Sequence, residues 1–229
     1  STAHLKVLPY FLGWSDPGAS ISASLQLGSA FAIIFYFRRD VSVLVNSFLS
    51  ILSHRILFKD ENTRLATYIF VASIPIIIFG FFIKLFWDDY SNSYFRGLTF
   101  IAIISIIMSF LLAISEIYGQ KKKLLIDVQI GDIILLGISQ SLAIFPGVSR
   151  SGITLTSALF SGIERQTAAR LSFLIGIPAI SISGFVELLN LYKSTSVMNL
   201  FPIIIGIFSA FLSSIIAIDL LLRFLTKNN

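Results

Sequence analysis

The sequence has 229 residues, of which 55% are hydrophobic and only 13% are charged, with a mean hydropathy of +0.88. A soluble domain carries about 25% charged residues, so this composition excludes an ordinary soluble domain and indicates a protein whose solvent is lipid. The sequence contains no cysteine, which excludes disulfides and thiol chemistry, and its two histidines, His4 and His54, are too few for a histidine-rich metal cage. Because the basic residues behind the net charge of +5 are spread between apolar runs, we expect no nucleic-acid partner.

Five apolar runs are long enough to cross a bilayer, which takes about 20 mostly apolar residues in a helix. Their length and unbroken hydrophobicity favour helices over the alternating strands of about 10 residues that build membrane barrels. The sequence therefore predicts an all-α, polytopic membrane protein. In chain order the predicted spans are Ala19–Phe37, Leu65–Leu85, Leu98–Ser115, Ala168–Leu191 and Leu200–Leu225.

A sixth apolar region, between the third and fourth spans, is interrupted. Its first run, Asp132–Phe145, has 14 residues, and Pro146-Gly147 separates it from a second short run, Ile153–Ile163. Each run is too short to cross a membrane alone. Two half-length segments around a Pro-Gly break predict a re-entrant hairpin whose tip lies within the membrane.

The lysines and arginines support this topology. With five crossings and a hairpin that returns to its own side, twelve basic residues fall on one side, four on the other, and Arg150 at the tip. This asymmetry fits the positive-inside rule and places the twelve in the cytoplasm; a hairpin that crossed would largely remove it. On this topology the segment around His54 is a basic cytoplasmic loop. The twelve are Arg38, Arg39, Arg55, Lys59, Arg64, Lys121, Lys122, Lys123, Arg165, Arg170, Arg223 and Lys227, and the four are Lys6, Lys84, Arg96 and Lys193.

A weak internal repeat divides the single transmembrane domain, residues 1–229, into halves. Ser1-Thr2-Ala3 precedes a span that contains Leu27-Gly28, and Arg150-Ser151-Gly152 precedes one that contains Ile175-Gly176, at offsets of 149 and 148 residues. Because these spans run in opposite directions, we expect an inverted repeat, of residues 1–120 and 121–229, with a site near the midplane where the halves meet. On this logic the first half lacks its start and the second half its end.

The hairpin tip carries the strongest candidate for a binding site. A membrane-embedded arginine is costly and therefore a functional hypothesis by default, and the fork of Arg150 suits phosphate oxygens. Nearby glycines allow close backbone approach, and the second arm would begin a helix whose N-terminus attracts anions. The alternative is that Arg150 snorkels from a loop nearer the interface. The predicted pyrophosphate-binding residues are Gly147, Ser149, Arg150, Ser151, Gly152 and Thr154.

Two further candidates are more ambiguous. Ser1 and His4, three residues apart, could serve as nucleophile and proton shuttle, or could belong to a frayed chain end. The repeat favours the first interpretation, because it brings this segment to the tip. Gln140, on the entering arm, could donate to a substrate or could hydrogen-bond a neighbouring helix.

The stretch from Ser139 to Thr154, which contains Pro146-Gly147-Val148-Ser149-Arg150-Ser151, resembles the signature of the bacterial undecaprenyl-diphosphate phosphatases, the bacitracin-resistance family. Ser1-Thr2-Ala3-His4 is similar to the end of another family motif, with Ala3 in place of glycine, and Gln26-Leu27-Gly28 also fits. The resemblance covers nearly the whole chain. It implies an inverted repeat with two re-entrant hairpins, and hydrolysis of undecaprenyl diphosphate to the monophosphate and phosphate, which recycles the lipid carrier for cell-wall synthesis and confers bacitracin resistance.

Carried over to this sequence, the resemblance implies that Arg150 binds the diphosphate, that Ser1 or a water attacks, and that His4 moves the proton. It also implies a divalent cation, Mg²⁺ or Ca²⁺, held by a glutamate pair that would lie upstream of Ser1, so we expect this chain by itself to be inactive. The implied location is the bacterial inner membrane, with the polyprenyl diphosphate and the bilayer as partners and a homodimer as a further expectation. The rival hypotheses are a transporter or flippase of a polyprenyl phosphate and a structural membrane subunit.

Overall fold

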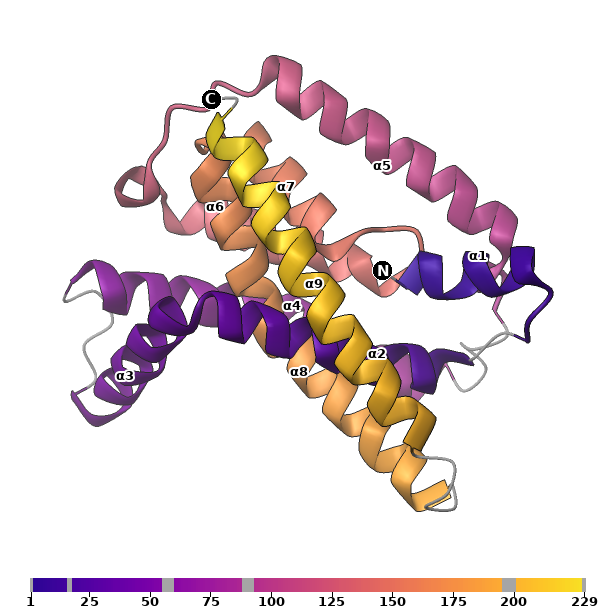
Figure 1. The fold of residues 1–229 in the computed structure, drawn as a ribbon. Helices are drawn as coiled ribbons and strands as arrows, with labels where there is room; N and C mark the ends of the chain where they lie inside the picture. The colour runs from indigo at the N-terminus through magenta and orange to yellow at the C-terminus, as the bar shows by residue number, and fades with distance from the viewer. Residues whose placement is uncertain (1, 16–17, 55–59, 88–92, 195–200, 228–229) are drawn as a thin grey trace.

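The computed structural model describes residues 2–15, 18–54, 60–87, 93–194 and 201–227, and these residues are almost entirely helical (Figure 1). The regular structure within these ranges is α-helical apart from short 3-10 turns and one isolated bridge, which confirms the predicted all-α class. The helices are α1 (Thr2–Leu12), α2 (Gly18–Tyr36), α3 (Arg38–His54), α4 (Glu61–Phe86), α5 (Leu98–Tyr118), α6 (Ile130–Ser141), α7 (Arg150–Phe160), α8 (Arg165–Ser194) and α9 (Phe201–Lys227), with 3-10 turns η2 (Tyr94–Arg96), η3 (Leu125–Asp127) and η4 (Leu142–Ile144).

Four helices, α4, α5, α8 and α9, are each long and apolar enough to cross a membrane. They correspond to four of the five predicted spans. The remaining predicted span, Ala19–Phe37, forms α2. Helix α2 meets the same requirement only together with α3, and the two helices are bent by 88° to one another. The predicted cytoplasmic loop after α2 is thus largely the helix α3, whose apolar residues recur at helical spacing. Figure 1 shows α3 projecting away from the bundle.

Helices α2, α8 and α9 pack closely enough for glycine to be required at their contacts. A Cβ added to Gly28 of α2 would lie 2.1 Å from the carbonyl oxygen of Ile207 in α9. Likewise, a Cβ on Gly206 of α9 would lie 2.4 Å from Leu25 Cδ2, and one on Gly184 would lie 2.6 Å from Leu27 Cγ. Small residues at such contacts are the usual means by which membrane helices approach one another.

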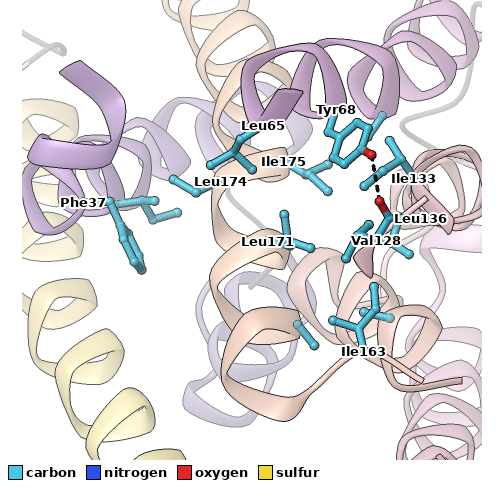
Figure 2. Packing of buried hydrophobic residues seen from close by; sticks show 14 of the residues in the cluster. Phe37, Leu65, Tyr68, Val128, Ile133, Leu136, Ile163, Leu171, Leu174 and Ile175 are labelled. Atoms are coloured by element: carbon cyan, nitrogen blue, oxygen red, sulfur yellow. Dashed lines mark hydrogen bonds between the residues drawn. The ribbon is translucent and has the colours of Figure 1, made fainter. Parts of the chain in front are cut away.

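The buried core lies where α4, α6, α7 and α8 meet (Figure 2). Leu136 and Leu171 are almost fully buried there, and the hydroxyl of Tyr68 in α4 donates to the carbonyl oxygen of Val128 at 2.7 Å. By contrast, large apolar side chains such as Phe110 of α5 and Phe208 of α9 are exposed. An apolar exterior around an apolar core is expected where lipid replaces water as the solvent.

Candidate active site at the hairpin tip

The interrupted apolar region forms a hairpin of α6 and α7 whose two ends meet. At its base, the N–H of Lys123 donates to Gly162 O at 2.9 Å, and the N–H of Glu164 donates to Lys123 O at 2.9 Å. The chain therefore returns to the place where it started, as the predicted hairpin requires. With 12 and 11 residues, the two arms rise only about 18 and 16 Å, roughly half of a bilayer's hydrocarbon core and headgroups.

Ion pairs attach the hairpin base to α5. The carboxylate of Glu116 lies 2.6 Å from Arg165 Nη2 and 2.6 Å from Lys121 Nζ, so a residue on each side of the hairpin binds the same group. Lys123 also pairs with Asp132 in the first turn of α6, at 3.0 Å. These contacts fix where both arms begin and end, and through the rigid arms they set the position of the tip.

The tip itself rests on α5. Gly147 adopts a φ of +101°, and a Cβ at this position would lie 2.9 Å from the carbonyl oxygen of Ile101. The hydroxyl of Ser105 donates to Gly147 O at 3.4 Å. The close approach predicted for Gly147 is therefore present, but the group that approaches is the α5 backbone. Gly147 therefore positions the tip against α5 and is not among the residues that line the cavity described below.

Helix α7 begins at the tip with a side-chain cap. Ser149 is the N-cap residue, and its hydroxyl accepts a hydrogen bond from the N–H of Gly152 at 3.2 Å. A Cβ on Gly152 would lie 2.9 Å from Ser149 Cβ, so the glycine permits this cap. The capped turn places Arg150 and Ser151 at the first two positions of the helix.

Arg150 lies against a cavity of about 370 Å³ between the tip and helices α2, α8 and α9. Its Nε and Nη1 atoms are buried and have no hydrogen-bond partner in the part of the chain that the structure describes. Its Cδ lies 3.8 Å from where a Cβ on Gly176 would be, so α8 leaves room for the side chain. A buried, unpaired guanidinium is costly, and an anion in the cavity would relieve that cost. The polar residues that line the cavity are Gln26, Ser29, Ser149, Arg150, Ser151, Ser172 and Ser214.

Two other predicted site residues, Thr154 and Gln140, do not line the cavity. Thr154 is fully buried, and its hydroxyl donates to Arg150 O at 2.8 Å, so it braces the first turn of α7 and does not line the cavity. Gln140 is also fully buried and donates from Nε2 to Ala72 O of α4 at 3.5 Å, which is the helix–helix contact considered as one of its two roles. Direct contact of either residue with substrate stays a prediction.

The predicted partner segment of the tip is only partly described. His4 lies on α1 with its side chain exposed, and it is not among the residues that line the Arg150 cavity. Ser1 lies outside the described residues. The structure therefore brings Ser149, Arg150 and Ser151 together, and the proposed roles of Ser1 and His4 stay predictions.

The polar residues that line the cavity from α2 and α9 were not predicted as part of the site. Ser29 of α2 and Ser214 of α9 share a hydrogen bond of 2.8 Å, and Gln26 lies one turn before Ser29 on the same face of α2. Polar residues three apart within an apolar span signal an inward face, so Gln26 and Ser29 could have been identified from the sequence. The pairing with Ser214, 185 residues away, could not.

The cavity does not fit the divalent cation that the resemblance implies. Its described lining offers hydroxyls, one amide and a guanidinium, but no carboxylate, and the described residues contain no cluster of three or more histidine, aspartate or glutamate side chains that could hold a metal. Mg²⁺ and Ca²⁺ require several oxygen ligands, usually including carboxylates. The cation stays a prediction.

The fold and site thus define a polytopic helical membrane protein with an arginine-tipped hairpin inserted into it. The family model described as bacitracin resistance protein BacA matches residues 1–229. Proteins named undecaprenyl-diphosphatase from Prochlorococcus marinus strains NATL1A and NATL2A are each 66% identical over the whole chain, which covers 82% of their length. One from Synechococcus sp. strain CC9902 is 46% identical over the whole chain and 81% of its own length. The chain belongs to the BacA family.

Proposed function

We propose that the protein hydrolyses undecaprenyl diphosphate to undecaprenyl phosphate and inorganic phosphate. Family membership over the whole chain and relatives named undecaprenyl-diphosphatase at 66% identity support this function. The observation that carries it in the structure is Arg150, which lines a cavity that also contains serine hydroxyls and whose buried Nε and Nη1 atoms have no hydrogen-bond partner among the described residues. The family's name ties this activity to bacitracin resistance.

Arg150 supplies the positive charge that the reaction needs. A diphosphate carries negative charge on its non-bridging oxygens, and the planar guanidinium can donate to two of them at once. The N-terminus of α7, an 11-residue helix, adds a partial positive charge at the same place. Fixed donors of this kind stabilise the charge on the transferring phosphoryl group, which is the main contribution a protein makes to phosphoryl transfer.

Hydroxyl groups complete the proposed diphosphate site. Ser149 and Ser151 flank Arg150 at the start of α7, and Ser29 and Ser214 line the cavity from α2 and α9. Hydroxyls can donate to phosphate oxygens without adding a competing negative charge. The C55 tail would lie along the apolar outer surface of the helices, where lipid and tail are interchangeable.

We propose that residues outside the Arg150 cavity carry out the bond-breaking step. Attack at the terminal phosphorus breaks its bond to the bridging oxygen, which stays on undecaprenyl phosphate, while the terminal group becomes inorganic phosphate. We propose a water, or Ser1 followed by water, as the nucleophile and His4 as the group that moves the proton. A divalent cation bound by carboxylates outside the described cavity is part of the same proposal and rests on the resemblance alone.

The proposed location is the plasma membrane of a bacterium, because the four to five candidate spans make the protein multi-pass and the carrier lipid is used there. The family resemblance assigns the reaction to recycling of the lipid carrier for peptidoglycan and other envelope polymers. The twelve basic residues on one side orient the hairpin base toward the cytoplasm.

Transport or flipping of a polyprenyl phosphate is a second candidate, and a specific feature favours it. The hairpin has arms of about half a span's length and ends beside the Arg150 cavity, and broken helices of this kind also occur at transporter sites. The two functions are separated by phosphate release, since a flippase moves the lipid without cleaving it.

The test is phosphate release from undecaprenyl diphosphate by purified full-length protein in nanodiscs, compared with Arg150→Ala. We expect release by the wild type and a loss of about 10²–10³-fold or more in the variant, the cost of removing one transition-state donor. Arg39→Ala is the control, because Arg39 is exposed and lies outside the cavity lining, and it should keep nearly full activity. Substrate binding without release would exclude the phosphatase, and full activity in Arg150→Ala would exclude the proposed site.

A further inference from the structure

Helix α3 turns away from the bundle where α2 ends. Because the two helices are bent by 88° to one another and α2 is a predicted span, α3 runs nearly parallel to the membrane plane (Figure 1). Its first turn contains Arg38 and Arg39, which belong to the twelve basic residues assigned to the cytoplasm, so we call this side of the membrane the basic side. An amphipathic helix that lies along the membrane at this level is an interfacial helix.

Polar and apolar residues occupy different flanks of α3. The polar flank repeats at helical spacing and consists of Arg39, Ser42, Asn46, Ser50 and Ser53. The apolar flank has the spacing i, i+3, i+4, i+7, i+8 of a single stripe, and it consists of Val41, Leu44, Val45, Phe48 and Leu49. An interfacial helix directs its apolar flank toward hydrocarbon and its polar flank toward headgroups and water.

The apolar flank forms one wall of a groove of about 300 Å³ between α3, α4 and α8. The rings of Phe48 and Phe70 lie with their centroids 5.7 Å apart and join the α3 wall to the α4 wall. Val45 and Leu49 are 53% and 57% exposed, so the groove is open to the outside of the bundle. A void there would lose van der Waals contacts, so a hydrocarbon chain of the bilayer fills it. The lining from α4 and α8 is also entirely apolar and consists of Ala66, Ile69, Phe70, Leu174, Ile177 and Pro178.

The groove is separate from the Arg150 cavity. Helix α8 borders both, but Leu174 and Ile177 line only the groove, and no residue lines the two together. The groove lies near the basic side, because its α4 residues fall within the first ten residues of that helix, which begins at Glu61. It is therefore placed to hold a chain of the surrounding bilayer beside the proposed active site and not within it.

Arg38 lies at the start of the apolar flank. It precedes Val41 by three residues and Val45 by seven, which places it on the same stripe of the helix. Its side chain is exposed, its guanidinium lies 5.4 Å from the centroid of the Phe35 ring, and it pairs with no carboxylate in the part of the chain that the structure describes. Asp40, the acidic residue of the same turn, pairs with Arg170 of α8. The charge of Arg38 is thus available to an anion outside the protein, at the level of the lipid headgroups.

We propose that the groove beside α3 binds an acyl chain of an anionic phospholipid of the cytoplasmic leaflet, with the phosphate of its headgroup on Arg38. From Val41 to Leu49 the helix rises about 12 Å, and the chain lies along this stretch. The groove alone would not select a lipid, since all phospholipids have similar chains. Selection comes from Arg38, and one arginine beside an anionic headgroup is worth about fivefold in affinity. The proposal does not depend on the proposed function.

Quenching of tryptophan fluorescence by lipids with brominated chains measures which lipid occupies the groove. In the full-length protein Trp14 and Trp87 are replaced by phenylalanine, and Phe48→Trp supplies a single reporter in the groove. The matched reporter is Phe110→Trp, which is exposed on α5 outside the groove. In vesicles of phosphatidylglycerol and phosphatidylcholine, with bromine on one lipid at a time, we expect about a fivefold preference for phosphatidylglycerol at Phe48→Trp and none at Phe110→Trp.

Two neighbouring arginines provide the matched test of the headgroup contact. Arg38→Gln should abolish the preference at Phe48→Trp, whereas Arg39→Gln, which removes an equal charge from the polar flank, should keep it. Phe70→Trp places a second reporter on the α4 wall, so that the measurement does not rest on one substitution, and the same preference is expected there.

Three results would overturn the proposal. The first is the absence of a preference at both groove reporters, or its equal loss in Arg38→Gln and Arg39→Gln. The second is weak quenching by both lipids in the groove with normal quenching at Phe110→Trp, which would mean that a second copy of the chain covers it. The third is displacement of brominated phosphatidylglycerol by a small fraction of undecaprenyl phosphate, which would assign the groove to a prenyl chain. None of these results bears on phosphate release, so the proposed function is tested separately.

Discussion

Helices α1 and α7 have 11 residues each and contain the segments that were matched in the predicted inverted repeat, yet their environments differ. Helix α7 buries one face against α5, α6 and α8. Helix α1 leaves Tyr10 66% and Phe11 78% exposed. The difference is in what holds each helix: α7 has an antiparallel arm, a closed base and a tip seated on α5, and α1 has none of these in the described chain. The comparison indicates that a sequence motif forms a site only where neighbouring segments hold it in place.

The same contrast separates the two candidate halves of the active site. Arg150 is presented to a cavity by the cap of α7 and the rest of the hairpin, whereas His4 is exposed and lies outside the cavity lining. The structure thus contains the supports of the proposed binding half. The inverted repeat itself stays a proposal.

Removing the support of the tip should have the largest effect on stability. Gly147→Val places a β-branched residue at a φ of +101°, with its Cβ 2.9 Å from Ile101 O, and should cost about 2–4 kcal/mol and most of the activity. Thermal unfolding in detergent and phosphate release measure both effects. The control is Gly80→Ala, where the added Cβ meets nothing within 4 Å and stability should be kept. Unchanged thermal stability and phosphate release in Gly147→Val would show that the tip does not depend on its contact with α5.

Loosening the base should have a smaller effect. Glu116→Gln weakens the pairs with Arg165 and Lys121, which are partly exposed, so we expect a loss of about 1 kcal/mol and a several-fold decrease in kcat/KM. The reversed pair, Glu116→Arg with Arg165→Glu, should recover part of the loss. Recovery of stability without recovery of kcat/KM would contradict a role for the base in positioning Arg150.

Replacing Gln140 should have the smallest effect on affinity. Its amide contacts Ala72 O of α4 at 3.5 Å, and the residue is not part of the cavity lining. Gln140→Leu, of similar size, should therefore keep the KM for undecaprenyl diphosphate within about threefold, with a stability change near 1 kcal/mol or less. A KM increase of tenfold or more would restore Gln140 as a substrate ligand.

Much of the fold could be predicted because its signals are local. The lengths of the apolar runs predicted the spans, and α5 begins at Leu98, where it was expected. The Pro146-Gly147 break and the charge asymmetry together predicted the returning hairpin. Helix α3 was missed because its charged first turn and basic C-terminal neighbours were interpreted as a loop, although its apolar residues have helical spacing.

The site was predicted only in part, for reasons that differ between residues. Thr154 could have been placed correctly, because a threonine within a helix commonly donates to the carbonyl four residues earlier, as it does to Arg150. The wall formed by Ser29 and Ser214 depends on two helices far apart in the sequence, and one sequence does not give their packing. The role of Gly147 was anticipated as close approach, but the approaching group was not.

The division into a binding half and a chemical half is tested most directly by measuring affinity and turnover separately in two variants. Equilibrium binding of undecaprenyl diphosphate and single-turnover phosphate release would be compared for Arg150→Ala and His4→Ala in full-length protein. We predict that Arg150→Ala loses at least about tenfold in affinity, whereas His4→Ala keeps its affinity and loses turnover by about 10²-fold or more. Wild-type affinity in Arg150→Ala would contradict the proposed binding site at the hairpin tip.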